Sequence, residues 1–118
     1  MELRQVYEQL QGDYDSAIKR LMSEKFMKKY LKKFIDNKMD EAIMRALDAK
    51  DYETAFREAH NLKGVCANLN LDRLKVSASE LTEALRSGQP QGDITELINS
   101  LNADYNMTVE ALSNIEFS

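Results

Sequence analysis

Apolar residues recur every three or four positions along most of the chain, which is the spacing of amphipathic helices. The clearest case lies between residues 52 and 69, where the apolar positions fall on one stripe at about 100° per residue. These positions are Tyr52, Ala55, Phe56, Ala59, Leu62, Cys66 and Leu69. A second stripe comprises Leu71, Leu74, Ala78, Leu81 and Leu85. The pattern predicts a protein built from helices.

Capping residues and loop formers divide this pattern into segments. Asp13, Ser23 and Asp51 each stand before a periodic segment, as helix N-caps do. Asp93 with Glu96 resembles a capping box that opens the last helix, after a loop over residues 87–93. A polar break over residues 36–38 separates two periodic segments, and the pattern leaves open whether the helix bends or ends there.

The segments together predict an all-α fold. We expect an antiparallel up-and-down four-helix bundle over about residues 39–116. Shorter helices within an N-terminal extension, about residues 1–37, are expected to cover one end of it. At 118 residues, the chain has the length of a single domain.

Composition narrows the possible functions. A formal net charge of −4 argues against a general nucleic-acid binder, which needs a basic surface. The single cysteine forms no internal disulfide, and no apolar run is long enough to span a bilayer. The charged N-terminus also lacks the apolar core of a signal peptide. We therefore expect a cytoplasmic monomer that binds neither nucleic acid nor membrane.

His60 is the only histidine, and it lies in the segment AHNLKGVCANL. It lies about 120° from the centre of the apolar stripe, so its ring should point outward. Lys63 follows one turn later, and Gly64 leaves a gap beside the ring. A neutral imidazole can attack phosphorus, and a phosphorylated side chain carries about −1.5 to −2 charges. A lysine at i+3 is placed to offset part of that charge, so the segment suits a phosphoryl acceptor.

These residues resemble the histidine-containing phosphotransfer (HPt) domains of multistep phosphorelays. The HPt motif is approximately H-x-L-K-G followed by small residues and a glycine, and His60, Leu62, Lys63 and Gly64 match it. Asn70 stands where the family usually has glycine. Asparagine is the non-glycine residue best able to adopt the left-handed conformation at a helix end. The resemblance covers roughly residues 40–90.

The resemblance implies a phosphoryl carrier. His60 would accept a phosphoryl group from a receiver-domain aspartyl phosphate and pass it to another receiver, with Lys63 stabilising its charge. The implied partners are response-regulator receiver domains and a hybrid sensor histidine kinase. The chain would need no cofactor of its own, because the receiver would supply Mg²⁺. It has no Gly-rich ATP-binding loop, so whether such a carrier counts as an enzyme stays open.

The helix face around His60 is the expected docking surface for receivers. Gly64 would provide clearance, with Phe56, Ala67 and Arg57 around it. Arg57 has an alternative role, because it is also placed to pair with Glu53 or Glu58.

Two other functions fit the sequence. One is an adaptor that docks receivers through the same face without carrying phosphate. The other is a polyanion-binding module that uses the lysine-rich segment EKFMKKYLKKF. In our interpretation those lysines form a solvated face, with Phe26 and Tyr30 in the core on the opposite side. No metal site is expected, since Cys66 lies about 120° from His60 and no second histidine exists.

Overall fold

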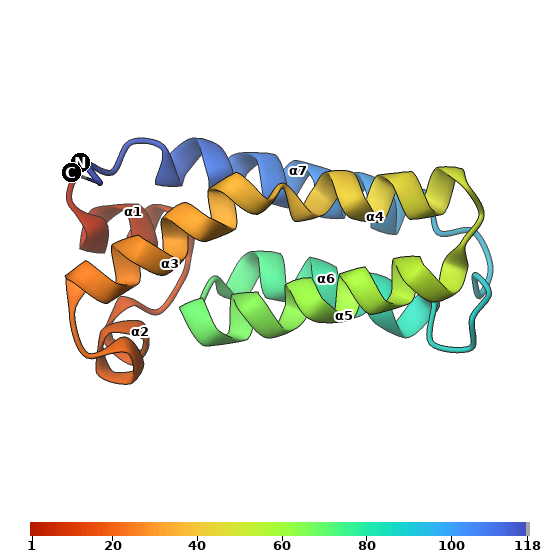
Figure 1. Cartoon of the computed structure of the whole chain (residues 1–118), viewed down its shortest axis with the longest axis horizontal. Coiled ribbons are helices and arrows are strands. Elements are labelled where there is room, and N and C mark those ends of the chain that lie inside the picture. Colours follow the sequence, from red (N-terminus) through yellow and green to blue (C-terminus); the bar gives the residue numbers. More distant parts are fainter. Residues whose placement is uncertain (118) are drawn as a thin grey trace.

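The computed structural model describes residues 1–117, which form seven helices (Figure 1). The helices are α1 (Leu3–Gln9), α2 (Tyr14–Leu21), α3 (Glu24–Asn37), α4 (Met39–Asp48), α5 (Tyr52–Leu69), α6 (Asp72–Ala84) and α7 (Thr95–Leu112). The arm made by α3 and α4, together with α5, α6 and α7, forms an antiparallel bundle, and α1 and α2 lie at one end of it. The prediction of an all-α helical bundle is confirmed.

The polar break over residues 36–38 ends one helix and starts another. Lys38 adopts the left-handed conformation there, with φ 48° and ψ 53°. The first free N–H of α4, that of Met39, donates to the phenol oxygen of Tyr105 at 3.0 Å. Phe34 at the end of α3 stacks on the same Tyr105 ring, with 5.2 Å between centroids. A tyrosine of α7 therefore holds the two helices in line.

The placement of α3 differs from the sequence-based division of the chain. The sequence pattern predicts that residues 1–37 form an extension outside the bundle, but α3 packs against both α5 and α7. Its buried residues Met27, Leu31 and Phe34 belong to the same core as the buried residues of α5 and α7. Thus α3 forms part of the first arm of the bundle, and only α1 and α2 lie outside the bundle (Figure 1).

Three predicted N-caps are confirmed. The carboxylate of Asp51 accepts hydrogen bonds from the backbone N–H of Thr54 at 3.2 Å and from its hydroxyl at 2.7 Å. These bonds stabilise the ionised form and lower the pKa of Asp51. Asp13 and Ser23 accept the corresponding backbone bonds at the starts of α2 and α3. The helix that carries His60 therefore begins where its sequence indicates.

The predicted capping box at Asp93 and Glu96 is wrong. Helix α7 begins at Thr95, one residue later than a box with Asp93 as N-cap requires. Asp93 accepts from the backbone N–H of Thr95 at 2.9 Å and from its hydroxyl at 2.7 Å. The short aspartate side chain thus closes a turn with the residue two positions on, which leaves Glu96 in the first turn without a capping role.

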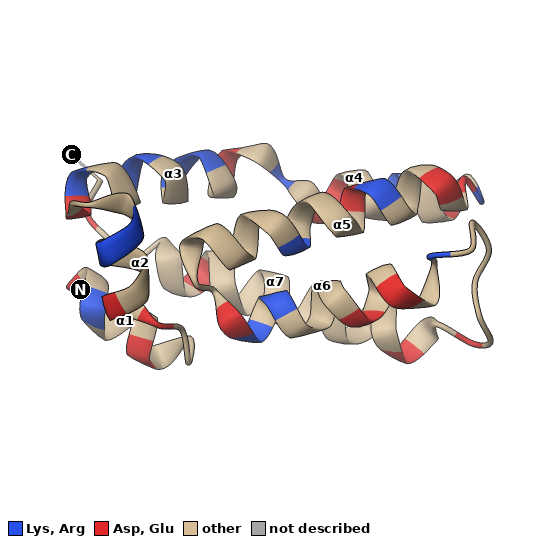
Figure 2. Ribbon diagram, turned by 90° about the horizontal axis from the view of Figure 1, so that it is seen from below, with Lys and Arg blue, Asp and Glu red and all other residues tan. Residues whose placement is uncertain are grey.

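The lysine-rich helix α3 confirms the predicted position of its lysines but not that of its aromatic residues. Its lysines occupy the side away from the core, seen as blue positions in Figure 2. Phe26 and Tyr30, however, are 48% and 41% exposed, so their assignment to the core is wrong. The buried side is centred near Met27, Leu31 and Phe34, and Phe26 lies about 110° around the helix from that centre.

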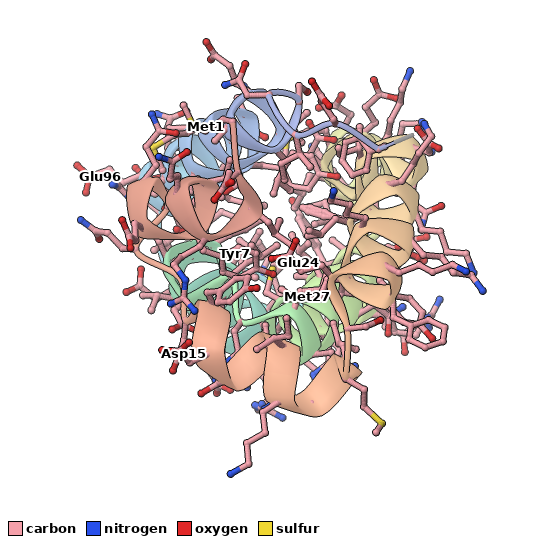
Figure 3. All side chains as sticks on the ribbon, turned by 90° about the vertical axis from the view of Figure 1, so that its left-hand side faces the viewer. Met1, Tyr7, Asp15, Glu24, Met27 and Glu96 are labelled. Carbon is pink, nitrogen blue, oxygen red and sulfur yellow. The ribbon has the colours of Figure 1, made fainter. Side chains whose placement is uncertain are left out.

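Side chains of the N-terminal helices α1 and α2 bind the last carbonyls of α5. The hydroxyl of Tyr7 on α1 donates to the carbonyl of Leu69 at 2.6 Å, inside the end of the bundle viewed in Figure 3. Arg20 on α2 donates to the carbonyls of Ala67 and Asn68 at 3.1 and 3.0 Å. The last carbonyls of a helix lack partners within it and carry partial negative charge, so a phenol and a guanidinium stabilise this end.

Gly12 is required at the same contact. Its backbone lies so close to α5 that an added Cβ would be 2.7 Å from the carbonyl oxygen of Asn70 and 3.0 Å from the Tyr7 ring. A backbone oxygen cannot move aside as a flexible side chain would. The connection between α1 and α2 can therefore reach the end of α5 only with glycine at this position.

We predict that Gly12→Ala lowers the free energy of unfolding by about 1–3 kcal/mol, the usual cost of overpacking. Urea unfolding followed by circular dichroism measures this change. An unchanged midpoint and slope would contradict the close approach between residue 12 and Asn70.

Candidate functional site

Helix α5 is buried along one side and open along the other. Its buried residues are Ala55, Ala59, Leu62, Cys66 and Leu69, and all lie on the predicted stripe. Because α4 and α6 pack against this helix, its rotation is fixed. His60 and Gly64 are exposed on the open side, as their positions in the sequence predicted.

The His60 ring has an aromatic neighbour one turn earlier. Phe56 is half-buried, and its ring lies 6.0 Å from that of His60 between centroids, with 17° between the planes. In the turn just after α6, the guanidinium carbon of Arg86 lies 5.6 Å from the Phe56 centroid. Phe56 therefore contacts both the imidazole and an arginine that lies far away in the sequence.

Arg86 also makes an ion pair with Glu83 in the last turn of α6. It donates through Nε and Nη2 to the two carboxylate oxygens of Glu83, at 3.0 and 2.5 Å. These hydrogen bonds lower the pKa of the Glu83 carboxyl, and the charge of Lys63 lowers it further. Lys63 is half-buried, which is less exposed than an outward lysine was expected to be. Its charge thus reaches the last turn of α6.

Gly64 borders an open space. A Cβ built on it meets nothing within 4 Å, so the glycine is not needed for helix packing. Within a helix, glycine is about 1 kcal/mol less favourable than alanine. The position therefore carries an energetic cost that no contact with a neighbouring helix explains.

The other two predicted docking residues lie on the same side of α5. Ala67 and Arg57 both fall within about 60° of His60 around the helix. Ala67 is half-buried. Arg57 is exposed and donates to the hydroxyl of Thr54 at 3.2 Å. Neither suggested ion pair, with Glu53 or with Glu58, forms among residues 1–117.

Asn70 has the conformation that its place at the end of α5 predicted. Its φ of 53° and ψ of 42° are left-handed. Its side-chain oxygen also accepts from Arg20 at 2.5 Å. Asparagine therefore ends the helix in the backbone geometry that glycine would supply, and it adds a side-chain bond that glycine lacks.

A groove opens beyond Gly64, between α2, α3 and α5. It encloses about 410 Å³ and is lined by Arg20, Leu21, Tyr30, Lys33, Phe34, Asn37, Val65, Asn68 and Leu69. Asn68 follows His60 and Gly64 on the exposed side of α5, about 80° around the helix from His60 and about 12 Å from it along the axis. The open side of α5 thus leads from the imidazole to this groove.

Cys66 does not contribute to the open face. It is buried, and burial raises the pKa of its thiol to about 12, so the thiol stays protonated and unreactive at neutral pH. Within residues 1–117, no three His, Cys, Asp or Glu side chains group together as metal ligands would.

Sequence reasoning missed Arg86, Glu83 and the residues of the groove. Glu83 and Arg86 have the spacing of an ordinary helix ion pair, and nothing in the sequence aligns that pair with Phe56. Tyr30 was assigned to the core rather than to a groove. These residues contact the His60 helix because of how the helices are aligned along one another. The spacing of apolar residues within one helix carries no information on that alignment.

Three further observations bear on the class of protein. None of the helices within residues 1–117 has the length and apolar character needed to cross a membrane. No curated protein and no solved structure gave a significant match to this chain. A family model described as "Hpt domain" matches residues 30–114, from the middle of α3 to just beyond α7. The chain therefore belongs to the Hpt family, the phosphotransfer domains of phosphorelays.

Proposed function

We propose that this protein is a phosphorelay intermediate that accepts a phosphoryl group on His60 from a receiver aspartyl phosphate and passes it to a second receiver. The observation that carries the proposal is the exposed position of the chain's only histidine, in the helix that bears the Hpt motif. Lys63 one turn later and the open space at Gly64 support it. The Mg²⁺ for the transfer would come from the receiver.

The chemistry is an exchange between two phosphoryl carriers. The lone pair of one imidazole nitrogen attacks phosphorus, a nitrogen–phosphorus bond forms, and the bond from phosphorus to the aspartate oxygen breaks. The aspartate leaves as a carboxylate, and the other ring nitrogen keeps its proton. Lys63 then offsets charge on the transferred group, and the reverse step returns the group to a receiver.

Receivers would dock on the open side of α5, from Phe56 across Gly64 to the groove. The groove combines apolar side chains such as Leu21 and Val65 with the cations Arg20 and Lys33. Exposed Tyr30 lies at the same place. An apolar surface with a few polar groups suits a protein partner, and it lies on the face from which an aspartyl phosphate must approach His60.

His60→Gln tests the proposal against the adaptor alternative. Because the chain has no other histidine, the variant should lose all labelling from receivers carrying ³²P-aspartyl phosphate, while its helical content stays unchanged. Histidine-type labelling of the variant would overturn the assignment. An adaptor would instead leave wild-type protein unlabelled and bind receivers equally with either residue.

Lys63→Ala should slow transfer into His60 by about tenfold or more, because a charge-assisted contact to the phosphoryl group is lost. Rapid-quench measurement of labelled receiver and labelled protein gives this rate. Lys75→Ala is the matched control, since Lys75 is an exposed lysine on α6. If Lys63→Ala unfolds much more easily while transfer is unchanged, Lys63 is structural.

Gly64→Leu should weaken receiver binding by at least about tenfold, because the new side chain projects into the approach path. The isolated variant should be as stable as wild type or more stable, since nothing lies within 4 Å of the added Cβ. Isothermal titration and urea unfolding measure the two effects.

Gly64→Ala is the control for that experiment. It should raise the free energy of unfolding by up to about 1 kcal/mol and interfere less with docking. Unaltered receiver affinity in Gly64→Leu, combined with easier unfolding, would place docking elsewhere, and the lysines of α3 would be tested next.

A further inference from the structure

Glu83 lies at the centre of a small charge cluster beside the phosphorylation face. Both of its carboxylate oxygens accept hydrogen bonds from Arg86, at 3.0 and 2.5 Å. The charge of Lys63 acts on the same carboxylate. Glu83 and Arg86 are each 55% exposed, so both side chains have room to move. One carboxylate on α6 therefore pairs with Arg86 and lies within the electrostatic reach of Lys63.

One of these cations follows His60 along α5, and the other contacts the aromatic neighbour of His60. Lys63 is one helical turn from it, and Arg86 stacks on Phe56, whose other neighbour is the His60 ring. A phosphoryl group on His60 brings about −1.5 to −2 charges to this side of α5. That group and the Glu83 carboxylate would then attract the same lysine and arginine.

We propose that Glu83 is the resting counter-ion of Lys63 and Arg86 and competes with the phosphoryl group on His60 for them. This inference rests on the proposed function and extends it. Glu83 is a positioning residue, because it acts through the two cations. Its competition makes phosphohistidine less stable than the cations alone would make it, which favours passing the group on to the next receiver.

Chemical phosphorylation tests the proposal without a receiver. Phosphoramidate would be used to phosphorylate His60, and ³¹P NMR would follow the second ionisation of the phosphoryl group against pH. Glu83→Gln should lower that measured pKa by a few tenths, because Lys63 and Arg86 are released to stabilise the doubly charged phosphoryl group. The shift should shrink in 0.5 M NaCl, since exposed charges are screened.

Glu80→Gln is the matched control, as Glu80 is an exposed glutamate one turn earlier on α6 and forms no ion pair among residues 1–117. It removes the same charge without touching Arg86. An equal shift in both variants, or no shift in Glu83→Gln, would overturn the proposal. If Glu83 had a purely structural role, Glu83→Gln would alter the urea midpoint and leave the pKa of the phosphoryl group unchanged.

The transfer equilibrium gives a second readout. With a phosphorylated receiver, Glu83→Gln should move the equilibrium toward phosphohistidine by about two- to fivefold, the range that exposed charge pairs reach. In a Lys63→Ala/Arg86→Gln background the same substitution should have no effect. A persistent effect there would contradict an action through these cations. If no receiver labels His60 while the titration shift is present, the proposed function fails and the role of Glu83 stands.

Discussion

The burial of one side of α5 is the constraint on which the rest of the site depends. Residues such as Ala59, Leu62 and Cys66 are completely buried, so the helix cannot rotate without exposing its apolar stripe to water. Small side chains among them allow α4 and α6 to approach closely. Because that orientation is fixed, His60 and Gly64 face outward. A core requirement thus sets where the nucleophile points.

The two ends of α5 are fixed by different means. Asp51 caps the start with its own carboxylate, which is a local signal. The other end depends on α1 and α2, whose Tyr7 and Arg20 bind the last carbonyls and whose Gly12 permits the approach. The N-terminal helices therefore do more than cover the bundle: they hold the end of the helix that carries His60, beside the groove.

The sequence predicted what local periodicity and capping control and missed what the register between helices controls. The stripe of α5, the N-cap at Asp51 and the left-handed Asn70 follow from residues within a few positions of each other. Tyr30 was misplaced, because which side of α3 is buried depends on where α2 and α5 lie. The contact of Arg86 with Phe56 depends on how α6 is aligned along α5, for which the sequence offers no signal.

The most direct test of the account is the chemical identity of the bond that the phosphoryl group makes. Protein labelled with ¹⁵N in its single histidine would be mixed with a phosphorylated receiver and followed by ³¹P NMR. We predict that the acyl phosphate signal decays as a phosphoramidate signal grows, coupled to a ring nitrogen of His60. Loss of the acyl phosphate to inorganic phosphate with no nitrogen-coupled phosphorus signal, across a panel of receivers, would contradict it.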